Sequence, residues 1–177
     1  GDEIMSVDID FSNLSIKDAL DLAILVEEEA EERSRELADN LEFHNTKEAA
    51  SFFRFRVTCE ANHGEELSAK RQELFGDQPV SVDRSLLWDV EAPGFEVAKT
   101  FMTIQDALEV ALAAETKAFK FFDGALPEVE DPEVRELFTE LRQEEVEHMQ
   151  MVRDQMKKAA DGDDFDPGDF ADEGVAQ

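Results

Sequence analysis

Residues 142–149, RQEEVEHM, place an acid and a histidine where a helix should bury leucine. The apolar residues around them follow one another at steps of three or four, which is the spacing of the buried face of a helix. The stripe consists of Val134, Leu137, Leu141, Glu145, His148 and Val152. An ionised carboxylate that is buried without a partner costs several kcal/mol, so the stripe predicts a partner for Glu145 inside the fold.

Three further glutamates fall on apolar stripes of predicted helices. Glu60 is followed three residues later by His63, which repeats the pair in RQEEVEHM, while Glu27 and Glu115 stand on two other stripes without a histidine. A Glu and a His at this spacing lie one turn apart on the same side of a helix, so both can reach one ion. One such pair is common in so acidic a chain. Two pairs and two lone glutamates, on four stripes, predict a dinuclear metal site.

The chain also carries an internal repeat. SIKDALDLAILVEEEA, from residue 15, and TIQDALEVALAAETKA, from residue 103, share Ile, Asp, Ala, Leu, Ala, Glu and Ala at matching positions. Each copy opens with a hydroxyl residue, Ser15 or Thr103, and an Asp three residues later, which is the capping-box pattern of a helix start. Because the glutamate-histidine pair recurs once in each half, the sequence indicates two similar helical hairpins.

Four long helices are expected, and they cover about residues 16–38, 46–75, 104–123 and 132–159. The links inside each hairpin are short, whereas residues 77–102 are too long for a turn and connect the two hairpins. This layout predicts an all-α four-helix bundle with one long crossover, in which the second and third helices run parallel. Leu86, Leu87 and Trp88 are expected to hold the crossover on the bundle.

The predicted bundle spans residues 15–159 and follows an N-terminal extension of residues 1–14. Residues 160–177 are rich in aspartate and contain no basic residue. A solvated, flexible acidic tail is therefore expected, with a docking peptide for a partner as the alternative.

Composition limits the classes of function. With 42% hydrophobic residues, 177 residues suffice for one core. Lys and Arg total 17 against 45 Asp and Glu, and the net charge of -28 argues against nucleic acid or an anionic membrane as a partner.

No apolar run approaches the roughly 20 residues that span a bilayer, and no signal-peptide layout opens the chain, so a cytoplasmic location is expected. The single cysteine, Cys59, excludes an internal disulfide.

The ligand types predict which metals would bind. Four carboxylates carry four negative charges, which two divalent cations neutralise, and this removes the cost of burying them. Carboxylate oxygen together with imidazole nitrogen suits iron or manganese, whereas the shortage of thiolates argues against structural zinc.

The segments AILVEEEA, CEANH, ALAAETKA and EEVEH resemble the rubrerythrin family and, more broadly, the ferritin-like superfamily of di-iron carboxylate proteins. The resemblance covers residues 15 to about 158. It implies a ferritin-like bundle that binds two iron ions through six catalytic ligands. They are the terminal carboxylates Glu27 and Glu115, the bridging carboxylates Glu60 and Glu145, and the imidazoles His63 and His148.

Two departures from the family pattern matter. Rubrerythrins carry a further glutamate three residues after the ligand on the third helix, and here Ala118 stands in that place, so the six-ligand set is closer to that of bacterioferritin. Rubrerythrins also append a rubredoxin domain with four cysteines, whereas this sequence has one cysteine. The resemblance therefore implies an external electron donor.

By this resemblance we expect a di-iron oxidoreductase that oxidises bound Fe(II) with dioxygen or hydrogen peroxide, in oxidative-stress protection. Ferroxidase and peroxidase activity both remain open. The alternatives are an iron-binding storage or delivery protein without turnover and a purely structural metal site. A homodimer or a larger homo-oligomer is expected.

Overall fold

The computed structural model describes residues 9–83 and 102–170, in which every regular element is helical. The four long helices are α1 (Ile16–Phe43), α2 (Lys47–Phe75), α3 (Ile104–Ala125) and α4 (Pro132–Ala160). Three short 3-10 helices, η1 (Phe11–Asn13), η4 (Leu126–Glu128) and η5 (Pro167–Phe170), flank them. The all-α, ferritin-like four-helix bundle is therefore confirmed.

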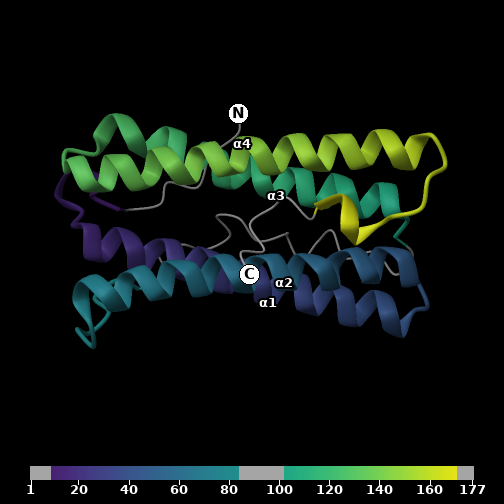
Figure 1. The fold of residues 1–177 in the computed structure, drawn as a ribbon, viewed down its shortest axis with the longest axis horizontal. Coiled ribbons are helices and arrows are strands. Elements are labelled where there is room, and N and C mark those ends of the chain that lie inside the picture. Colours follow the sequence, from purple (N-terminus) through teal and green to yellow (C-terminus); the bar gives the residue numbers. More distant parts are fainter. Residues whose placement is uncertain (1–8, 84–101, 171–177) are drawn as a thin grey trace.

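The helices form two antiparallel pairs that lie side by side (Figure 1). α1 packs along α2 and α3 packs along α4, while α2 and α3 run in the same direction, as a long crossover requires. Most of that crossover, including Leu86, Leu87 and Trp88, lies outside the described residues. No helix within residues 9–83 and 102–170 combines the length and the apolar character that crossing a membrane requires.

The helix starts follow the predicted capping chemistry. Ser15 Oγ accepts a hydrogen bond from the backbone N–H of Asp18 at 3.1 Å. At the start of α3, Thr103 and Asp106 form a complete capping box, in which each side chain accepts from the other's backbone N–H. Asp131 caps α4 ahead of a proline at the first helical position. These caps fix where three of the four long helices begin.

α1 continues to Phe43, beyond the expected end near residue 38. The reason is packing, because Leu37, Ala38 and Leu41 continue the buried stripe against Ala49 and Ala50 of α2. Burial of this apolar stripe prolongs the helix where the sequence offers no stop signal.

The core consists of two apolar clusters, one toward each end of the bundle. The first contains Leu20, Phe122 and Phe138, and the second contains Phe53 and Leu108. On each long helix the predicted ligands fall between the residues of the two clusters. The candidate centre therefore occupies the middle of the bundle.

Both ends of the described chain pack on the bundle. Phe11 of η1 lies edge-on to Phe121 at 5.7 Å and to Phe138 at 6.2 Å between ring centroids. Phe165, in the predicted acidic tail, lies edge-on to Phe52 at 5.3 Å, and its backbone N–H donates to Glu48. This part of residues 160–177 is therefore placed against α2.

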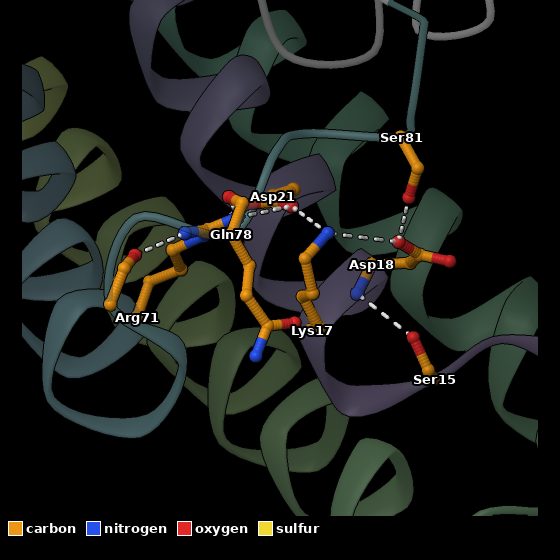
Figure 2. A network of polar contacts seen from close by, with 8 residues as sticks. Ser15, Lys17, Asp18, Asp21, Arg71, Gln78 and Ser81 are labelled. Carbon is orange, nitrogen blue, oxygen red and sulfur yellow. Dashed lines mark hydrogen bonds and ion pairs between the residues drawn. The ribbon is translucent and has the colours of Figure 1, made fainter.

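A polar network joins α1 to the end of α2 (Figure 2). Arg71 Nε donates to the buried Asp21 at 2.8 Å, and its other nitrogens donate to the carbonyl oxygens of Gly76 and Gln78. The guanidinium thus satisfies the carbonyls that follow the helix end and holds the departing chain against α1.

Candidate metal centre

Each long helix delivers one buried carboxylate to the middle of the bundle. Glu60, Glu115 and Glu145 are each 3% exposed, and Glu27 is 6% exposed. Burial at this level is rare for glutamate unless its charge is compensated. The stripes that predicted these four positions therefore correspond to the buried faces of the helices.

The α3–α4 hairpin brings three predicted ligands together. Glu115, Glu145 and His148 each offer a ligand atom, and these atoms lie within 4.8 Å of one another. His148 Nδ1 is 3.6 Å from Oε2 of Glu115 and 3.6 Å from Oε2 of Glu145. Two carboxylates and one imidazole at this separation form a cluster that could hold one metal ion.

The α1–α2 hairpin repeats only part of this arrangement. His63 Nδ1 lies 3.8 Å from Glu27 Oε1, which matches the approach of His148 to Glu115 in the other hairpin. The two imidazoles stack with ring centroids 5.2 Å apart and an interplanar angle of 2°, so the two half-sites adjoin. Among the described residues, however, only the α3–α4 ligands form a group of three.

Glu60 is engaged by two residues that sequence analysis did not single out. Arg56, one turn earlier on α2 and itself 8% exposed, places Nη2 3.0 Å from Glu60 Oε1. Ser34 Oγ of α1 donates to the same oxygen at 3.3 Å. Arg56 Nη1 also donates to Glu115 Oε1 at 2.7 Å. The signal was the spacing of Arg56 and Glu60, which suits an i,i+4 ion pair.

The carboxyl groups differ in how strongly they hold protons. Burial raises the pKa of Glu27 well above its usual value, and the carboxylates of Glu145 and Glu60 add to this effect. Burial likewise raises the pKa of Glu60 to about 7, although Arg56 opposes the change. For Glu115, burial is outweighed by Arg56 and His148, which hold its pKa well below the usual range.

The two histidines shift in opposite directions. Burial, together with the neighbouring His148, lowers the pKa of His63 to about 4. Burial also disfavours the charged form of His148, but the carboxylates of Glu115 and Glu145 raise its pKa well above the ordinary value. Without metal, the charged form is therefore favoured at His148 and the neutral form at His63.

Unsatisfied oxygens show whether these residues fit a metal. Oε2 of Glu27 and Oε2 of Glu60 are buried and accept no hydrogen bond from the described part of the chain, while Oε2 of Glu115 has His148 Nδ1 at 3.6 Å. Buried polar atoms are normally satisfied, so such oxygens need an explanation. Cations that prefer oxygen and imidazole ligands fit this donor set.

Comparison with known proteins agrees with the geometry. The sequence profile of the family described as Rubrerythrin matches residues 18–156. The crystal structure of an uncharacterized conserved protein from Magnetospirillum magnetotacticum MS-1 is similar, with a TM-score of 0.65 and 26% sequence identity over 82% of this chain and 95% of that chain. No curated protein matches the sequence.

Proposed function

This chain belongs to the rubrerythrin family, and from that premise we propose that it is a di-iron oxidoreductase, which oxidises bound Fe(II) with dioxygen or hydrogen peroxide. The observation that supports the proposal most is the set of buried glutamate oxygens without hydrogen-bond donors in the middle of the bundle. Four inward carboxylates and two imidazoles supply the ligands that a pair of iron ions requires.

The two hairpins suggest how the ligands are divided. Glu27 with His63 would serve as terminal ligands of one ion, and Glu115 with His148 would serve the other, because each carboxylate already lies beside its imidazole. Glu60 and Glu145 would each be shared by the two ions. Manganese suits the same donors and is the alternative metal.

When bound, two ferrous ions would supply the electrons that reduce the oxidant. The protein's own part is to hold the ligands on rigid helices and to keep bulk water away from them. Burial raises the pKa of Glu27 well above its usual value and so favours its protonated form, which would release the proton on binding a cation. Electrons for repeated turnover would come from a donor outside these 177 residues, because they contain one cysteine and no four-cysteine iron site.

The proposal is tested by loading the metal-free protein anaerobically with ferrous iron and then mixing it with oxygen or with peroxide. We expect the near-ultraviolet absorbance of ferric iron to appear with at least one oxidant, and the faster oxidant distinguishes ferroxidase from peroxidase. Iron that binds and stays ferrous with both would contradict the enzyme. That result would favour an iron-binding storage or delivery protein.

A matched pair of variants shows whether the oxidation occurs at this centre. Glu145→Gln should abolish it, because the substitution removes a ligand charge. Glu147→Gln, at an exposed position on the same helix, should leave it unchanged. Equal oxidation in both variants would place the reaction elsewhere.

A further inference from the structure

Arg56 puts a permanent positive charge among the proposed ligands. Its Nη1 donates to Glu115 Oε1 at 2.7 Å and its Nη2 lies 3.0 Å from Glu60 Oε1, so one guanidinium bridges a carboxylate of each hairpin. The side chain is 10% exposed, and arginine does not lose its proton in proteins. A buried cation of this kind depends on its carboxylate partners.

The repeat shows that this charge belongs to one hairpin only. Arg56 precedes Glu60 by one turn, and the residue that precedes Glu145 by the same spacing is Leu141, which is buried. Ser34, the second residue that engages Glu60, has Phe122 as its counterpart when Glu27 is aligned with Glu115. The two half-sites therefore differ in their immediate polar surroundings.

The contacts affect the two half-sites unequally. In the α3–α4 half, Arg56 contacts Oε1 of Glu115, while Oε2 of Glu115 faces His148. Glu115, Glu145 and His148 already lie close enough together to share one ion. In the α1–α2 half, Oε1 of Glu60 contacts both Arg56 and Ser34. The described residues of this half form no group of three ligands. One ion can enter the first half with Arg56 in place, in exchange for the proton of His148, whereas the second ion must draw Glu60 away from Arg56.

The number of charges in the centre also favours weaker binding of the second ion. Four carboxylates balance two divalent ions, and the Arg56 guanidinium is a further positive charge that lies beside two of these carboxylates. Like charges in a partly desolvated site repel by amounts worth a factor of ten or more in affinity.

We propose that Arg56 is a built-in counter-ion of the metal-free centre, which makes the two metal sites unequal: the α3–α4 site fills first, and the α1–α2 site fills weakly because Glu60 must leave Arg56. This inference rests on the proposed di-metal function. It concerns metal affinity rather than oxidation, so the two can fail separately.

The test is an anaerobic titration with Mn(II), in which electron paramagnetic resonance counts the free ion. The wild type should bind two ions with dissociation constants that differ by about tenfold or more. Arg56→Leu, which copies the second hairpin, should tighten the weaker site by about tenfold and bring the two constants together. Arg54→Met is the matched control, because Arg54 also pairs with two carboxylates but is exposed; it should behave as the wild type.

Thermal stability, measured without and with metal, is a second readout. Without metal, Arg56→Leu should unfold at a lower temperature than the wild type, because Glu60 and Glu115 lose their counter-ion, and Mn(II) should restore more stability to the variant than to the wild type. If Arg56→Leu does not fold, Arg56→Gln removes the same charge while keeping a hydrogen-bond donor.

The outcomes separate the two claims. Two ions with unchanged affinities in the Arg56 variants would contradict the role of Arg56 and leave the di-metal centre intact. Loss of the tight site in these variants would also contradict the role of Arg56, because Arg56 would then hold Glu115 in position for the metal and would not oppose metal binding. Failure of both wild type and variants to bind Mn(II) would contradict the proposed function itself.

Discussion

Glu60 illustrates how a single residue balances opposing forces in this bundle. It is 3% exposed, and it has a hydroxyl and a guanidinium at one oxygen and no hydrogen bond from the described residues at the other. Burial dominates, so its pKa rises to about 7. At neutral pH a carboxyl group with this pKa divides between its protonated and ionised forms, and binding of a cation favours the ionised form.

This shift predicts how stability without metal depends on pH. Between pH 4.5 and 7 the unfolded chain has lost the Glu60 proton while the folded protein keeps it, so this group destabilises the fold as the pH rises through that window. The Glu60→Gln variant should lack this pH-dependent destabilisation, because glutamine does not titrate. In a chelator, we expect urea unfolding to show a stability advantage of the variant that grows from pH 4.5 to pH 7 and then levels off. A constant difference between the two proteins would contradict the raised pKa.

At the scale of the helix, the capping residues determine the start of each hairpin. Thr103 and Asp106 satisfy one another's backbone N–H groups in a complete box, with both bonds at 3.1 Å. α3 carries Glu115 three turns later, so the register of this ligand depends on where the helix begins. The cap thus links a local hydrogen-bond pattern to the position of a proposed ligand.

Removal of this cap should be measurable. Thr103→Ala should lower the free energy of unfolding by about 1 kcal/mol, because one N–H at the helix start loses its acceptor. Thr139→Ala is a suitable control, since Thr139 is exposed in the middle of α4 and its hydroxyl donates only to the carbonyl of Arg135. Urea denaturation of both variants checks the difference. An equal loss in the two variants would contradict the role of the box.

At the scale of the whole molecule, a polar layer separates two apolar clusters. Leu20 and Phe138 belong to the cluster on one side, and Phe53 and Leu108 belong to the cluster on the other, with the carboxylates and imidazoles between them. Without metal, this middle layer is held by ion pairs such as that of Arg56 and Glu115. Bound cations would add links between all four helices.

Metal binding should therefore stabilise the whole bundle. With free Mn(II) at about 100 times its dissociation constant, linkage gives about 2.7 kcal/mol per site, which for a domain of this size raises the melting temperature by about 5–10 °C. Glu145→Gln should lose most of the rise. Differential scanning calorimetry in metal and in chelator measures it, and an unchanged melting temperature in the wild type would contradict a cation-linked core.

Much of this architecture could be predicted from the repeat and its caps. Ser15, Thr103 and Asp131 mark three helix starts because local hydrogen bonding determines them. The end of α1 was placed too early, because packing against α2 rather than a local signal sets it. Arg56 was missed since arginine usually keeps its charged end in water, and only the fold shows that Glu60 and Glu115 enclose it.

The most direct test of the central claim is the number of metal ions in the anaerobically loaded protein. The wild type and Glu147→Ala should each carry two ferrous ions per chain, whereas Glu145→Ala should carry fewer than one. Two ions retained in Glu145→Ala would contradict the dinuclear centre proposed for the middle of this bundle.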